Sequence, residues 1–214
     1  KLGYHWDVIP RNANHCDQRC GACGYGCPYS RKQSTLLTFL QDAADKGARF
    51  LVNATVDRVL AESGIATGVA ATVVDPATGA RHAVTVRAKT VVIAAGALHS
   101  PAILLRSGIR NPHLGRNLRL HPVVAVTGFY PDPIRCWEGS LQTRYSDQFG
   151  QPADGYGFKF EVAPGHPGLM GLALPWDSGR QHKEDMARLE HAAPIIVLTR
   201  DKNGGTVTLD KHGE

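Results

Sequence analysis

VVIAAGALHSPAILLRSGIR, residues 91–110, is the stretch that decides the fold. It follows Thr90, and residues 90–94 form a continuous run typical of a parallel strand covered on both faces. Ala95, Gly96 and Ala97 are small and let a backbone approach a ligand without side chains in the way. Ser100-Pro101 then predicts a helix start, whose unpaired amides favour an anionic or strongly polar group. A simpler interpretation is that Gly96 only eases a strand-to-helix turn.

Upstream of this stretch, the sequence predicts a helix, a buried strand and an antiparallel meander. Ser34 or Thr35 caps a helix that Gly47 ends, with one apolar face packed on a sheet. Residues 48–54, ARFLVNA, suit a second buried parallel strand. Alternation over residues 69–73 and 84–88, around a turn at 75–79, predicts a three-stranded meander. The expected fold class is therefore α/β, with a parallel sheet that carries an antiparallel β-meander.

Downstream, the pattern changes to short apolar stretches broken by Gly and Pro, which favour a mostly β portion. Gly108 ends the helix of the opening stretch. The segment PIIVLTRDKNGGTVTLD predicts a hairpin with Asn203-Gly204 at its turn. We therefore place a boundary near residue 120, with residues 1–120 in the α/β portion and residues 121–214 in the mostly β portion.

Composition bears on several classes of protein. A chain of 214 residues with 43% apolar content can bury one core or form part of a larger enzyme. The net charge of +5 comes from scattered basic residues, so no nucleic-acid partner is expected. The longest apolar run is too short for a transmembrane segment. Five cysteines, an odd number, do not suggest a secreted disulfide framework and favour a reducing, cytoplasmic location.

The opening stretch resembles the second signature of the glucose-methanol-choline (GMC) oxidoreductases. Its matching positions are Gly96-Ala97, Ser100-Pro101, Ile103-Leu104 and Ser107-Gly108-Ile109; only Arg110 departs, where the family usually has Gly. The resemblance extends over nearly the whole chain, through Arg11-Asn12-Ala13, Lys32-Gln33-Ser34-Thr35, Gly115-Arg116-Asn117-Leu118 and His121-Pro122. Among GMC branches, GYG, HPG and IIVLTRD are most similar to the long-chain fatty alcohol oxidases.

This resemblance implies FAD as cofactor. It makes residues 1–120 the C-terminal part of an FAD-binding domain and residues 121–214 the first part of a substrate-binding domain. It also implies that the backbone of Val56 faces the adenine ring and that Ala95, Gly96 and Ala97 lie close to the cofactor. A simpler role for Val56 is packing in the meander core, and both roles hold if the backbone binds while the side chain packs.

The implied reaction is removal of an alcohol proton by a histidine base and hydride transfer to the flavin, which molecular oxygen or another acceptor reoxidises. The substrate is a small-molecule alcohol, and the branch suggests a long-chain or bulky apolar one. The Gly-x-Gly-x-x-Gly phosphate loop has no match, since Tyr29 stands at its third glycine after Gly24-Tyr25-Gly26. We therefore expect an internal piece, from Lys1 to Glu214, of a longer enzyme. No histidine matches the base, so no catalytic residue is assigned, and His99, His121 and His166 are expected to be structural.

The cysteines offer an alternative function. Cys16, Cys20, Cys23 and Cys27-Pro28 resemble the ferredoxin run, with only the first spacing one residue too long. Four thiolates at this spacing can hold an iron-sulfur cluster or zinc, which would make the segment an electron-transfer module. Cysteines recur at several of these positions in the flavin family without a known cluster role, so we favour structural thiols and assign no metal ligand.

A third class is a noncatalytic binding module. It predicts a cooperative, monomeric fold for residues 1–214 alone. We expect the opposite, because the sheet would lack its first strands and expose a large apolar face.

Overall fold

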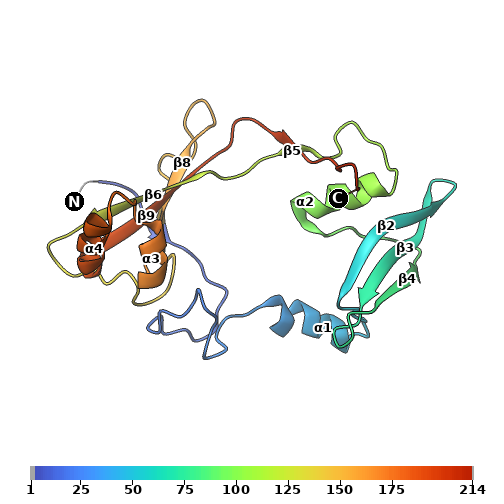
Figure 1. The fold of residues 1–214 in the computed structure, drawn as a ribbon, viewed down its shortest axis with the longest axis horizontal. Coiled ribbons are helices and arrows are strands. Elements are labelled where there is room, and N and C mark those ends of the chain that lie inside the picture. The colour runs from blue at the N-terminus through green and yellow to red at the C-terminus, as the bar shows by residue number, and fades with distance from the viewer. Residues whose placement is uncertain (1–2, 214) are drawn as a thin grey trace. The chain divides into compact units, whose positions relative to one another are not determined.

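A computed structural model describes residues 3–213 of the chain, and Figure 1 labels most of its helices and strands. The chain forms two compact units, each built from two separate segments. Unit 1 comprises Lys1–Lys46 and Leu120–Asp201, and unit 2 comprises Gly47–Arg119 and Lys202–Glu214. Lys1 and Glu214, on which the expectation of a cut chain rests, lie outside the described residues. The family's domain boundary at residue 120 stays a prediction.

Unit 1 is built around a five-stranded antiparallel sheet with the order β1-β7-β8-β9-β6. Its strands are β1 (Asp7–Val8), β6 (Val123–Phe129), β7 (Arg144–Ser146), β8 (Phe158–Val162) and β9 (Ala192–Thr199). The N-terminal segment joins this sheet because β1 pairs with β7. A strand from the first ten residues thus completes a sheet whose other strands all lie beyond residue 120.

Helices cover part of this sheet. They are α3 (Pro167–Ala173), α4 (Gly179–Ala187) and the 3-10 helix η2 (Leu189–His191). The buried side chains that join them to β9 are Met170, Leu174, Leu189 and Ala192, with Phe129 of β6, Trp137 and Met186 packed around them. Figure 1 shows α3 and α4 beside β9 and β6. The sequence pattern predicted only short β stretches here, because Gly and Pro between the apolar residues concealed the helical spacing.

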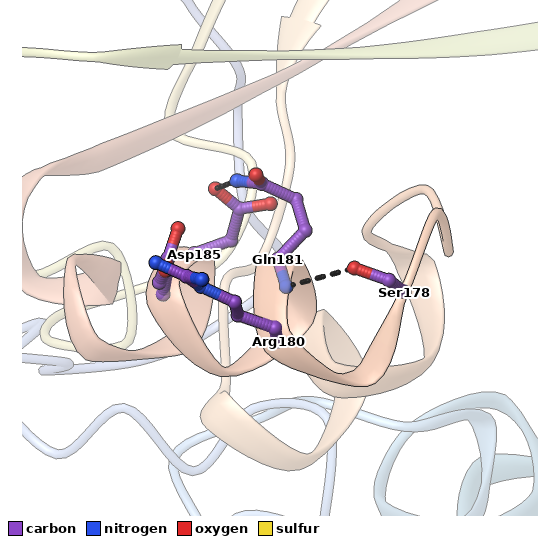
Figure 2. Close-up of polar contacts among 5 residues, drawn as sticks. Ser178, Arg180, Gln181 and Asp185 are labelled. Atoms are coloured by element: carbon purple, nitrogen blue, oxygen red, sulfur yellow. Dashed lines mark hydrogen bonds and ion pairs between the residues drawn. The ribbon is translucent and has the colours of Figure 1, made fainter.

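The helix α4 is short and polar, and its own side chains hold its first turns. Ser178 Oγ accepts the N–H of Gln181 at 3.1 Å, and the Gln181 amide donates to Asp185 at 3.1 Å (Figure 2). Arg180 forms an ion pair with Glu184 at 2.9 Å. These are the N-cap and the i,i+4 contacts that stabilise exposed helices by tenths of a kcal/mol up to about 1 kcal/mol each.

Unit 2 contains the predicted meander. Strands β2 (Ala54–Glu62), β3 (Ile65–Val74) and β4 (Arg81–Arg87) pair antiparallel in that order. The predicted turn after β3 is also present: the Asp75 carboxylate accepts the N–H of Ala77 and the hydroxyl of Thr78, and these hydrogen bonds lower the pKa of Asp75. Alternation of apolar residues therefore predicted this sheet correctly.

The hairpin predicted at Asn203-Gly204 is wrong. Strand β10 (Gly205–Thr206) pairs with β5 (Arg116–Leu118) instead of turning back onto β9. A Cβ added at Gly204 would lie 3.1 Å from Asn117 Cα, and the Val207 N–H donates to the Gly115 carbonyl at 2.6 Å. The backbone of β10 therefore pairs with β5, which is distant in sequence, and not with β9 as the local turn pattern predicted.

The mixed α/β class is confirmed, but the expected parallel strands are not formed among the described residues. Residues 48–53 and 90–94 belong to no helix or strand, and every named strand pair is antiparallel. A strand needs a neighbouring strand for its backbone N–H and C=O groups, and neither segment is paired in a sheet here. Most of their apolar side chains are accordingly exposed, as at Val92, which is 82% exposed.

The first predicted helix is split and exposed. The 3-10 helix η1 (Thr35–Leu37) and the helix α1 (Phe39–Asp45) follow each other, and Gly47 adopts a φ of +88° after the end. The expected apolar face packs on no sheet in unit 1, since α1 has no buried residue and Phe39 is 76% exposed. No helix among residues 3–213 has the length and apolar character required to cross a bilayer.

Candidate functional site

The helix α2 (Gly96–Arg106) carries the predicted ligand-binding turn, but it begins five residues earlier than Ser100-Pro101 indicates. Ser100 therefore lies in the helix, where its Oγ accepts the N–H of Ala95 at 3.0 Å. Pro101 has no N–H, so the carbonyl of Ala97, four residues before it, receives no intrahelical hydrogen bond. The start of α2 thus offers unpaired N–H groups and an unpaired carbonyl at the same turn.

The backbone at this turn is open. Gly96 has a φ of +79°, and a Cβ added there would meet no atom within 4 Å. Glycine is favoured here by the backbone conformation and not by crowding, because L-residues adopt this left-handed region at a cost of about 1–2 kcal/mol. Ala95, Gly96 and Ala97 are all exposed. A ligand can therefore approach these residues, and the N–H of Ala95 already donates to Ser100 Oγ.

A cavity of about 450 Å³ in unit 2 starts at this turn. Its lining residues are Ala97, Ser100, Pro101 and Leu104 of α2, residues 113–119, and Val207. Two cationic residues, Arg116 and Arg119, also line the cavity. Helix amides and guanidinium groups both favour negative charge, so the cavity suits a ligand with an anionic group and an apolar body.

Val56 lies on a different part of unit 2. It sits on β2 opposite Ala71 of β3, is half-buried, and is followed by a β-bulge between Val56 and Arg58. Strand β2 is an edge of the three-stranded sheet, so β3 engages only one side of its backbone. The structure brings Ala95, Gly96 and Ala97 together at the start of α2, but of the four predicted contact residues only Ala97 lines the cavity.

The C-terminal end of α2 is fixed to β2. Arg106 Nε donates to the carbonyl of Asp57 at 2.8 Å, and the N–H of Val59 donates to Ser107 Oγ at 2.8 Å. Ser107 Oγ also donates to the carbonyl of Ile103 at 2.6 Å. Gly108 follows with a φ of +73°, as its predicted role at the helix end requires. The signature residues at this end therefore orient the helix on the meander.

We expect Ser107→Ala to lower the free energy of unfolding by about 1–2 kcal/mol, because the partly buried N–H of Val59 loses its acceptor. Chemical denaturation of the whole protein measures this change. Thr78→Ala is the matched control, since its hydroxyl is also paired but fully exposed, and it should change stability by about 0.5 kcal/mol. Equal effects of the two substitutions would contradict the anchoring role of Ser107.

The arginines of the cavity were not predicted as site residues. Gly115-Arg116-Asn117-Leu118 is a matching stretch of the family, but nothing local shows that it lies beside α2. The conformation of Gly115 is the available signal: its φ is +71°, and an added Cβ would collide with the Val207 carbonyl. That close approach brings the two distant segments of unit 2 together around the cavity.

The four clustered cysteines line a separate cavity of about 750 Å³ in unit 1. No group of three or more His, Cys, Asp or Glu side chains within residues 3–213 is arranged to hold a metal ion. The iron-sulfur alternative therefore gains no support. His166, by contrast, has the expected structural role, since its Nδ1 accepts the N–H of Gly168 at the start of α3.

Comparisons with known proteins agree with the signature in α2. The family model described as GMC oxidoreductase matches residues 1–123, which include β1, the meander and α2. The chain is 30% identical over 223 residues to the long-chain-alcohol oxidase FAO3 of Arabidopsis thaliana, covering 96% of this chain and 29% of that protein. It is 34% identical over 222 residues to the long-chain-alcohol oxidase FAO4A of the same plant, covering 97% and 30%.

Further similarities lie in bacteria. An uncharacterized GMC-type oxidoreductase of Mycobacterium tuberculosis is 35% identical over 207 residues, covering 96% of this chain and 31% of that protein. The crystal structure of pyridoxine 4-oxidase from Mesorbium loti has the same fold over 86% of this chain and 37% of its own, with a TM-score of 0.59 and 18% identity. The chain spans about a third or less of the length of the curated relatives it matches. On the family match and these identities, the chain belongs to the GMC oxidoreductases.

Proposed function

We propose that this chain is part of an FAD-dependent oxidoreductase that acts on the CH–OH group of alcohols. The observation that carries the proposal is the first turn of α2, where Ala97 lines a cavity that also contains two arginines and the space beside the Gly96 Cα is open. The donors fit the cofactor, because FAD has anionic phosphates and a ring edge that accepts hydrogen bonds. When bound, FAD supplies the hydride acceptor of the reaction.

In this proposal, the residues of this chain bind the cofactor and orient it. The amides at the start of α2 would donate to the cofactor, and Arg116 and Arg119 would supply positive charge in the cavity. Leu104 and Pro101 exclude water from the apolar side of the cavity. The backbone of Val56, on the outer edge of β2, is proposed to contact the adenine ring. No residue of this chain is proposed as the base that removes the alcohol proton.

The proposed domain assignment follows the family. Residues 1–120 are proposed as the C-terminal part of the FAD-binding domain and residues 121–214 as the first part of the substrate-binding domain. The match of the family model to residues 1–123 supports the first assignment. The sheet of unit 1 recruits β1 from the first segment, so we propose that the two domains share strands across this boundary.

A long-chain alcohol is proposed as substrate, and molecular oxygen or another oxidant as electron acceptor. The support is the similarity to two plant proteins named long-chain-alcohol oxidases, at 30% and 34% identity. A shorter match, 34% identical over 113 residues, is to a 2-methyl-1,2-propanediol dehydrogenase of Mycolicibacterium austroafricanum, so a small alcohol is the alternative.

Turnover by the whole protein tests the substrate class. We expect kcat/KM for a linear long-chain alcohol to exceed that for a short diol by at least about a hundredfold, because each buried CH₂ group contributes about 0.8 kcal/mol. Oxygen consumption and reduction of an artificial dye, measured in parallel, identify the acceptor. Turnover of the short diol at an equal kcat/KM would contradict the long-chain assignment and leave flavin binding unaffected.

A further inference from the structure

The cavity of unit 1 gathers an unusual set of side chains. Cys16, Cys20, Cys23 and Cys27 all line its volume of about 750 Å³. Cationic side chains line it too, namely Arg11, Arg31 and Lys32. A cavity of this size accommodates a small organic molecule. Thiols and positive charge thus share one space, and its lining residues differ from those of the cavity in unit 2.

Cys27 occupies a special position in this cavity. The chain turns after it at Pro28, and Ser30 adopts a φ of +51°, which directs the following amides back toward the sulfur. The Arg31 N–H donates to Cys27 Sγ at 3.1 Å. Hydrogen bonds from the backbone of Lys32 and Arg31 lower the pKa of the Cys27 thiol. Such concave groups of amides stabilise anions, here a thiolate.

Part of the cavity wall is held in place by hydrogen bonds. Arg11 donates through Nη2 to the carbonyl of Leu141 and through Nη1 to Cys23 Sγ at 3.7 Å. The side chain of Gln142, the next wall residue, donates to the buried carboxylate of Glu161 at 3.1 Å. Because these contacts fix the wall, a ligand enters a preformed space beside Cys27 rather than a loose loop.

We infer that Cys27 is a modification site that undergoes thiol–disulfide exchange with small anionic disulfides such as glutathione disulfide. The Cys27 thiolate attacks one sulfur of the disulfide, a Cys27–sulfur bond forms, and the disulfide bond breaks. The other half leaves as a thiolate, which takes a proton from water. Cys27 is oxidised to a mixed disulfide and half of the reagent is reduced. Arg11, Arg31 and Lys32 outnumber Asp17, the acidic residue in the cavity lining, so the cavity favours the anionic reagent.

Cys136 provides an internal contrast. It lies outside this cavity, its Sγ donates to the carbonyl of Gly165 at 3.4 Å, and burial raises the pKa of its thiol. Its thiolate population at neutral pH is therefore small, and exchange requires the thiolate. The two cysteines of one chain should thus differ in rate under the same conditions.

Peptide mapping by mass spectrometry after timed exposure to glutathione disulfide tests the inference on the whole protein. We expect Cys27 to be modified before Cys136. The modification rate of Cys27 should reach half its maximum at a pH below that of an ordinary thiol, because the lowered pKa keeps the thiolate present at lower pH. The neutral reagent hydroxyethyl disulfide should modify Cys27 with a smaller rate advantage over Cys136. In Lys32→Gln, the rate ratio of the anionic to the neutral reagent should fall by about threefold.

Cys27→Ser should remove the fast modification and leave the rate at Cys136 unchanged. Cys136→Ser is the matched variant, and it should leave the fast modification at Cys27. Two results would overturn the inference: modification of Cys27 no faster than that of Cys136, or copurified iron or zinc whose removal is needed before Cys27 reacts. Flavin content is measured alongside, so that a failure here is separable from a failure of the proposed function.

Discussion

Ala97→Glu is expected to lower the flavin content of the whole protein by at least about tenfold. Ala97 lines the cavity of unit 2 beside the unpaired amides of α2. A carboxylate at this position would compete for those amides and for Arg116, and it would repel an anionic ligand. A loss of tenfold corresponds to about 1.4 kcal/mol of binding free energy, which is small for a desolvated charge opposite an anion.

The flavin-to-protein ratio after purification, from the absorbance of released cofactor, measures this effect. Ala83→Glu is the matched control, because it makes the same change at an exposed position on β4, outside the cavity lining, and it should leave the flavin content unchanged. Both positions are exposed, so neither variant should unfold the protein. Full flavin content in Ala97→Glu would show that this turn is not part of the flavin-binding site.

The second large effect is expected for Gly68→Ala, which should lower the free energy of unfolding by about 3 kcal/mol or more. Gly68 is buried in the central strand of the meander with a φ of +152°. A Cβ there would collide with the Val86 carbonyl and lie 3.0 Å from Arg87 Cα. Both neighbours are backbone atoms of β4, so the strand itself must move.

Gly64→Ala separates this clash from backbone strain alone. Gly64 lies in the turn between β2 and β3 with a φ of +80°, and an added Cβ would meet no atom within 4 Å. Its substitution should cost about 1 kcal/mol. Urea denaturation of both variants gives the difference, and equal costs would show that the close approach of β4 to Gly68 is not present in solution.

The meander was predictable because the patterns that specify it lie within one short stretch of sequence. Apolar alternation on β3 and β4, with the Asp75 side chain closing the turn between them, needs no distant partner. The end of α2 was predictable for the same reason, since Gly108 adopts the left-handed conformation that its position implies. The start of α2 was not, because Ser100-Pro101 is a helix-start pattern that here lies within a helix.

The sequence did not predict which distant segments pair with one another. Asn203-Gly204 is a strong hairpin signal, yet β10 pairs with β5 because Gly115 and Gly204 allow backbones to approach closely. Continuous apolar runs at residues 48–53 and 90–94 predicted parallel strands, but strand formation depends on neighbours that those runs do not contain. Arg116 and Arg119 were missed as site residues because only the tertiary fold places them beside Ala97.

The family resemblance was needed to interpret the predicted site. Gly96 alone is compatible with any strand-to-helix turn, and its open surroundings do not name a ligand. The matching positions on α2 indicated a flavoprotein, and the family match supports that interpretation. For the cysteines, the sequence pattern suggested more than the structure supports. Their spacing is typical of a metal site, whereas within the described residues their surroundings favour a single activated thiol at Cys27.

Hydrogen–deuterium exchange of the whole protein, with and without FAD, tests the central claim most directly. Main-chain amides at the first turn of α2, from Gly96 to Leu98, are exposed without intrahelical acceptors, so they exchange fast unless a ligand covers them. We predict that FAD slows exchange at these amides, while the exposed turn at Gly79 is unchanged. Protection by FAD elsewhere in the protein, with unaltered exchange at residues 96–98, would contradict the claim that this turn contacts the flavin.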